Sequence, residues 1–79
     1  MKNLYREFTG NRMKALRLEK KKKQMEMASL LGIKLKAYQS YEEKRAEPSI
    51  FIIKKFCKII RMKVDKFLEG SPESDLQKA

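Results

Sequence analysis

The chain has 79 residues, of which 20 are Lys or Arg and 10 are Asp or Glu, so its formal net charge at pH 7 is +10. This length allows one small domain, and the sequence has no apolar run near the roughly 20 residues of a membrane helix. One cysteine excludes an internal disulfide, and the lack of histidine removes the commonest general base and metal ligand.

The excess of positive charge indicates a polyanionic partner, either nucleic acid or an acidic membrane surface, unless it serves solubility alone. The first ten residues, MKNLYREFTG, lack the apolar segment of a signal peptide. A single cysteine fits a reducing compartment. These features predict a cytoplasmic protein.

Residues 1–8 form an N-terminal extension in which Leu4 and Phe8 are one helical turn apart. Two interpretations are open. The extension is either a helical segment that folds onto the domain or a frayed arm, and Lys2 and Arg6 of such an arm would reach a nucleic-acid backbone.

Thr9 fits an N-cap, so the first main helix is predicted over residues 10–20 with Met13 and Leu16 on its buried face. Four lysines follow at positions 20–23, which is typical of a solvated segment. They also concentrate positive charge beside the start of the next helix.

Residues 24–42 carry a pattern typical of two short helices that cross through a tight turn. Ala28 is small enough for a close crossing, and Gly32 tolerates the positive φ that the turn requires. The apolar positions that would face a shared core are Met27, Leu31, Ile33, Tyr38 and Tyr41. The first of these helices is predicted over residues 24–31 and the second over about 34–44.

Two further helices are predicted after Pro48, over 50–61 and over 64–69. The first has its core spacing at Ile50, Ile53, Phe56, Cys57 and Ile60. The polar residues 71–79 are expected to be a disordered tail.

This register resembles the lambda-repressor/Cro-type (Xre-like) helix-turn-helix DNA-binding family, and the resemblance extends over residues 10–68. Outside the motif it is carried by Gly10-Asn11-Arg12-Met13, Leu16-Arg17, Glu42, Pro48-Ser49-Ile50, Ile53, Phe56, Cys57, Ile60 and Val64-Asp65-Lys66-Phe67-Leu68. It implies an all-α, compact five-helix domain over residues 9–70. It also implies that Arg17 pairs with Glu42, and that Cys57 fills space where the family has a small residue.

The sequence departs from the family pattern at two places. Lys21, Lys22 and Lys23 replace a glycine, an apolar residue and a helix cap, so either the first helix runs longer or the loop is loose. Lys34 replaces a second cap. At both helix starts a positively charged lysine stands where a capping residue is expected. This would strengthen sequence-independent binding and weaken the start of the helix.

The resemblance assigns DNA contacts to two sets of residues. Side chains on the outer face of the second motif helix would read base edges in the major groove: Lys34, Leu35, Lys36, Gln39, Ser40 and Glu43. The phosphate contacts would come from Lys22, Lys23, Gln24, Lys44 and Arg45.

Several apolar residues are surplus to the predicted core: Leu18, Met25, Leu30, Phe51, Ile52 and Ile59. They are either scattered surface residues or a surface for a dimer or another protein, and for the latter we single out Phe51, Ile52 and Ile59.

The leading hypothesis is a sequence-specific regulator of transcription that binds double-stranded DNA as a homodimer on an inverted repeat. The alternative is a protein-interaction module with the same fold, such as the antitoxin of a toxin–antitoxin pair. A membrane-binding amphipathic peptide is disfavoured because charges surround every helix. No enzymatic activity, cofactor or metal is expected, because no carboxylate pair or glycine-rich phosphate loop is present.

Overall fold

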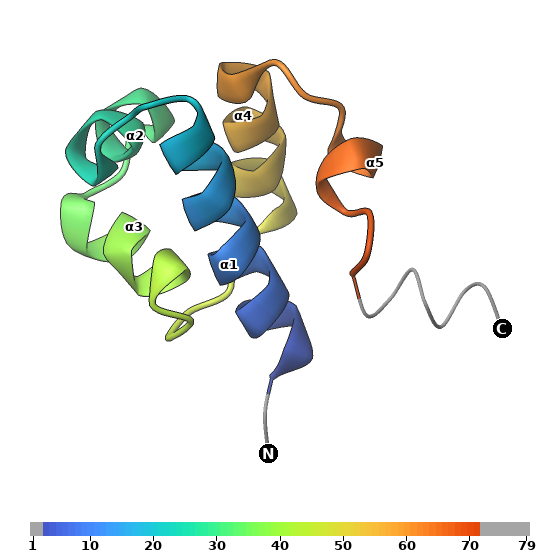
Figure 1. The fold of residues 1–79 in the computed structure, drawn as a ribbon. Coiled ribbons are helices and arrows are strands. Elements are labelled where there is room, and N and C mark those ends of the chain that lie inside the picture. Colours follow the sequence, from blue (N-terminus) through green and yellow to red (C-terminus); the bar gives the residue numbers. More distant parts are fainter. Residues whose placement is uncertain (1–2, 72–79) are drawn as a thin grey trace, which may run out of the picture.

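In the computed structural model, which describes residues 3–71, the chain folds into five helices with no strand in that range (Figure 1). They are α1 (Leu4–Glu19), α2 (Gln24–Leu31), α3 (Leu35–Glu42), α4 (Ile50–Ile60) and α5 (Val64–Phe67). α1 and α2 both pack on α3, and α4 packs on α2 and α5. The predicted all-α, five-helix fold is confirmed. No helix among the described residues is long and apolar enough to cross a membrane.

α1 begins earlier than the sequence suggested. Asn3 is its N-cap and accepts a hydrogen bond from the Arg6 amide at 3.0 Å. Thr9 lies inside the helix and its hydroxyl donates to the Tyr5 carbonyl at 3.0 Å, so the prediction that Thr9 caps the helix is wrong. From Leu4 onward the extension is helical rather than a frayed arm, with Phe8 packed against the core. Lys2 lies outside the described residues.

The lysine run ends α1 without lengthening it. α1 stops at Glu19, and Lys21 adopts the left-handed conformation with φ 56°. Glycine adopts this conformation without strain, whereas a lysine there costs about 1–2 kcal/mol of backbone strain. The Lys21 amide donates to the Leu18 carbonyl at 2.9 Å, which closes the turn.

The turn between α2 and α3 has the predicted geometry. Gly32 has φ +74° and its amide donates to the Ser29 carbonyl at 3.0 Å. A methyl group on Gly32 would meet only the flexible end of Lys55, so the positive φ is the reason for glycine here. Ala28 is buried in the core, and its carbonyl accepts a hydrogen bond from the Ile33 amide at 3.0 Å.

Every helix contributes to one core, which consists of Met13, Leu16, Met27, Ala28, Leu31, Tyr38, Ile53, Phe56, Cys57, Ile60 and Phe67. Phe67 joins three helices, since its ring meets Phe8 and Phe56 edge to face at centroid distances of 6.4 and 5.8 Å. Arg12 ties α5 to α1 by donating from Nε to the Phe67 carbonyl at 2.9 Å. Cys57 is buried, and burial raises the pKa of its thiol.

The C-terminal boundary differs slightly from the expectation. Ser71, which was assigned to the tail, is buried, and its amide donates to the Leu68 carbonyl at 3.0 Å. The rest of the predicted tail, 72–79, lies outside the described residues.

Candidate nucleic-acid interface

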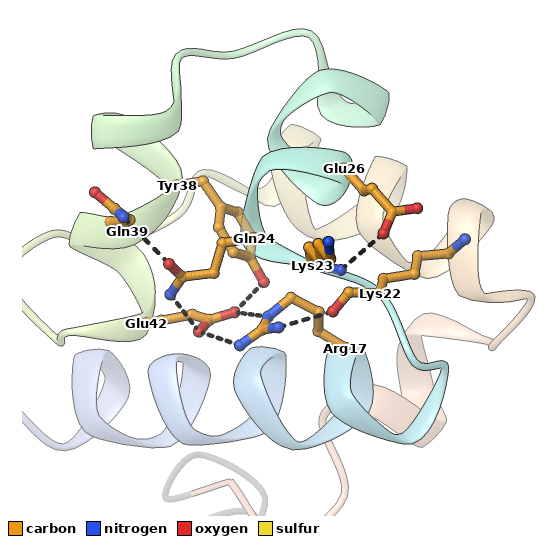
Figure 2. A network of polar contacts seen from close by, with 8 residues as sticks. All are labelled: Arg17, Lys22, Lys23, Gln24, Glu26, Tyr38, Gln39 and Glu42. Carbon is orange, nitrogen blue, oxygen red and sulfur yellow. Dashed lines mark hydrogen bonds and ion pairs between the residues drawn. The ribbon is translucent and has the colours of Figure 1, made fainter.

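A buried ion pair fixes α3 relative to α1 (Figure 2). Arg17 on α1 donates from Nε to Oε2 of Glu42 at 2.6 Å and from Nη2 to Oε1 at 3.1 Å. Its third nitrogen, Nη1, donates to the Lys22 carbonyl at 2.8 Å. Arg17 and Glu42 are only 7% and 6% exposed. The pair fixes the orientation of α3 relative to α1, because a two-point contact of this kind has one favourable geometry.

Glu42 is a shared acceptor at the end of α3. Tyr38 donates its hydroxyl to Oε2, and Gln24 donates from Nε2 to Oε1 at 3.0 Å. Burial by itself would raise the pKa of Glu42, but the hydrogen bonds from Arg17, Tyr38 and Gln24 outweigh it and hold the pKa below the ordinary value of 4.5. Burial, together with the Glu42 contact, raises the pKa of the Tyr38 hydroxyl. The carboxylate is therefore charged at neutral pH.

The network reaches the outer face of α3 through two glutamines. Gln39 donates from Nε2 to Oε1 of Gln24 at 3.2 Å, and Gln24 is in turn bound to Glu42 (Figure 2). The sequence predicts separate contacts, of Gln39 with bases and of Gln24 with a phosphate. In the structure they form one unit. Gln39 is consequently half-buried rather than fully extended into solvent.

The remaining predicted base-reading residues divide by exposure. Lys34 and Lys36 are exposed at the start of α3, and Leu35 between them is half-buried. Ser40 is half-buried and its hydroxyl donates to the Ala37 carbonyl at 2.6 Å, which restrains its orientation. The first turns of α3 therefore present two free ammonium groups beside the Gln24–Gln39 pair.

Glu43 and the basic loop after it lie beyond the end of α3. Glu43 is the C-cap of the helix and its carboxylate binds Arg45, with Oε1 3.0 Å from both Nε and Nη2. Lys44 is exposed and adopts φ 65°. The Arg45 charge is thus partly neutralised within the loop, while Lys44 remains an exposed cation.

The starts of α2 and α3 are electropositive and lack side-chain caps. Lys23 and Lys34 hold the N-cap positions, and neither provides a side-chain hydrogen bond to its helix. Glu26 accepts from the Lys23 amide at 3.0 Å, which satisfies one donor of α2. The other free amides and the helix dipole at both starts favour an anion.

Three of the five predicted phosphate contacts lie at the start of α2, whereas Lys44 and Arg45 follow the end of α3. Lys22, Lys23 and Gln24 lie at the start of α2, with Lys23 exposed and the other two half-buried.

Among the described residues, no group of three or more His, Cys, Asp or Glu side chains could hold a metal ion.

The spacing of residues in the sequence did not reveal the contact between Gln24 and Gln39. A signal was available, since both side chains carry a donor and an acceptor and stand on helices that pack against each other. The contact of Arg12 with α5 could not be predicted from residue types, because its acceptors are backbone carbonyls.

Comparison with known proteins agrees with this geometry. Residues 13–67 match the model of a family described as helix-turn-helix (HTH_3). The crystal structure of a hypothetical transcription factor, NHTF from Neisseria, is similar with a TM-score of 0.75 and 21% sequence identity, covering 95% of this chain and 85% of that one. At this identity the likeness is one of fold. No curated protein matches the sequence.

Proposed function

Because the chain belongs to the helix-turn-helix (HTH_3) family of DNA-binding regulators, we propose that it recognises a specific double-stranded DNA sequence through α3. The observation that carries the proposal is the position of Gln39. Its amide lies on the outer face of α3 and is held by Gln24, which is held by the buried Glu42. A side chain oriented in advance loses little freedom when it meets a base.

Base reading falls to the first turns of α3, since an α-helix fits the major groove and contacts base edges with residues near its N-terminus. Gln39 can pair with adenine and Lys36 can donate to guanine. Lys34, Leu35, Ser40 and Glu43 complete the proposed surface. Leu35 suits a thymine methyl group, and Ser40 and Glu43, being engaged within the protein, are the least available.

Phosphate binding falls to Lys22, Lys23 and Gln24 around the start of α2, and to Lys44 and Arg45 in the loop after α3. Backbone amides at the starts of α2 and α3 add neutral donors to these charges. If about five phosphates are neutralised per protomer, affinity falls steeply with salt concentration. The Arg45 contribution requires its bond to Glu43 to be shared or exchanged.

Selection of bound duplexes from a random DNA pool tests the proposal. We expect one preferred sequence, arranged as an inverted repeat whose half-sites are about one helical turn apart if a homodimer binds. Lys36→Ala and Gln39→Ala should each relax the selected sequence. Lys58→Ala, which removes one positive charge from an exposed position of α4, is the matched control for Lys36→Ala and should leave the selected sequence unchanged. Selection of no sequence by the unaltered chain contradicts the proposal.

A second candidate is a protein-interaction module, such as an antitoxin, and the observation that favours it is an apolar side chain in solvent. Phe51 is 77% exposed, whereas Ile52 and Ile59, predicted with it as a partner surface, are half-buried against the core. Co-expression with neighbouring genes followed by co-purification tests this candidate. Recovery of the chain without any partner counts against it.

A further inference from the structure

An open groove runs between α4 and the segment that leads into α5. Its apolar lining comes from Phe51, Cys57, Met62 and Val64. The most exposed of these is Phe51, on the first turn of α4. Burial of an aromatic side chain is strongly favourable, and one left in solvent at the edge of a groove marks a contact surface.

Lysines surround this apolar lining. The groove is also bordered by Lys54, Lys55, Lys58 and Lys63, and no acidic residue contributes to its lining. Lys55 is oriented by its Nζ, which donates to the Leu31 carbonyl at 3.0 Å. The other three are exposed. Phe51, Lys54, Lys55 and Lys58 are three or four residues apart, so they form one stripe along α4.

The groove lies apart from the DNA-reading surface. α3 and α5 are on opposite sides of α1 in Figure 1. α3 packs on α1 and α2, whereas the groove is formed by α4 and the α4–α5 connection. The function proposed for α3 therefore leaves this surface unused.

We propose that the groove binds an acidic amphipathic helix of a partner protein. Leucine or phenylalanine side chains of that helix would cover Phe51, Met62 and Val64, and its carboxylates would face the four lysines. A helix suits the groove because it repeats its side chains at the same spacing as the α4 stripe.

The charge of the groove distinguishes this occupant from two others. A second copy of the chain placed groove to groove would bring eight lysines together, since each copy contributes four. DNA would satisfy the lysines but would leave the apolar lining without a partner, because phosphates do not cover Phe51. An acidic helix with one apolar face satisfies both parts of the surface.

The test uses the full chain and a fluorescent helical peptide of glutamate and leucine, with leucines three and four residues apart. A scrambled peptide of the same composition carries the same charge and controls for non-specific attraction to a basic protein. We expect the ordered peptide to bind at least about tenfold more tightly than the scrambled one. NMR shift changes should centre on α4 and residues 62–64. Equal binding of the two peptides, or shift changes centred on α3, would overturn the proposal.

Variants separate the two surfaces. Phe51→Ser and Lys58→Glu should each weaken the ordered peptide about tenfold or more and leave DNA selection unchanged. Leu18→Ser, which removes an apolar side chain of 54% exposure from α1, is the control for Phe51→Ser and should not affect the peptide. Lys36→Glu should abolish DNA selection and leave the peptide bound.

Two further outcomes also count against the proposal. Self-association that is lost in Phe51→Ser, without peptide binding, assigns the groove to a second copy. Shift changes in the groove caused by DNA assign it to nucleic acid.

Discussion

Gln39 on α3 donates to Gln24 on α2 at 3.2 Å, so the two helices of the motif present their amides to solvent as a joined pair. Because the two side chains contact each other, their substitutions should have coupled effects on the free energy of DNA binding. In a double-mutant cycle measured on DNA binding, Gln24→Ala and Gln39→Ala should deviate from additivity by about 0.5–1 kcal/mol. Each single change should cost about 1–3 kcal/mol on the selected sequence.

The control cycle pairs Gln24→Ala with Lys36→Ala. No hydrogen bond between Lys36 and Gln24 is found in the described part of the chain, so these two effects should add. Additivity in both cycles would show that Gln24 does not position Gln39.

The buried pair of Arg17 and Glu42 should matter more to stability than the exposed pair of Arg45 and Glu43. Arg17→Leu leaves a carboxylate buried without its counter-ion, and we expect the free energy of unfolding to fall by about 3 kcal/mol or more. Arg45→Leu removes an exposed pair and should cost less than about 1 kcal/mol. Urea denaturation measures both. Equal losses would mean that the Arg17 pair is no more than a surface contact.

The stability that Glu42 contributes should disappear in acid. Because its folded pKa is held below 4.5, the unfolded chain takes up the proton first as the pH falls. The contribution is complete above pH 4.5 and is lost as the pH falls through the folded pKa. The stability of Glu42→Gln should therefore lie below that of the unaltered chain at neutral pH and approach it in acid. Urea denaturation of both over about pH 3–7 measures the gap, and a constant gap contradicts the pKa assignment.

Gly10 permits the close approach of α1 to the end of α3. A methyl group there would lie 2.6 Å from the Tyr41 carbonyl oxygen and 2.9 Å from Cγ of Lys44, and the carbonyl cannot move without shifting the helix. Gly10→Ala should therefore lower the free energy of unfolding by about 1–3 kcal/mol, despite the better helix propensity of alanine. Asn11→Ala, at an exposed position of the same helix, should be neutral or slightly stabilising. Thermal melts of both variants measure the difference.

The helix-turn-helix and most of the core were predictable because each depends on side chains at fixed spacing. The prediction that Ile50 belongs to the core is wrong, because this first residue of α4 is 47% exposed. The period of apolar residues places Met27, Leu31 and Tyr38 inside, and a residue with positive φ has to follow α2. The bounds of α2 were predicted to the residue. α3 was predicted two residues too long at its end, because Glu43 and Lys44 do not themselves stop a helix.

The start of α1 was missed because Thr9 was predicted as the N-cap. The cap is Asn3, and the earlier start brings Phe8 against Phe67, a contact between α1 and α5 that local sequence does not reveal. The polar network was missed for a different reason. Hydrogen bonds between Gln24, Gln39 and Glu42 depend on how helices cross, which residue types alone do not determine.

Lysine holds the N-cap position of α2, α3 and α5, and an ammonium group has no lone pair to offer a backbone amide. Glu26 accepts from the Lys23 amide at the start of α2, and the other free amides at the starts of α2 and α3 receive no oxygen from the side chains of their N-cap residues. A DNA phosphate would then act as the cap, so part of the helix-forming free energy is realised only on the nucleic acid. The melting temperature of this protein should therefore rise as more of it is bound to its DNA site. This rise should be larger than in a relative whose serines and threonines cap the same helices.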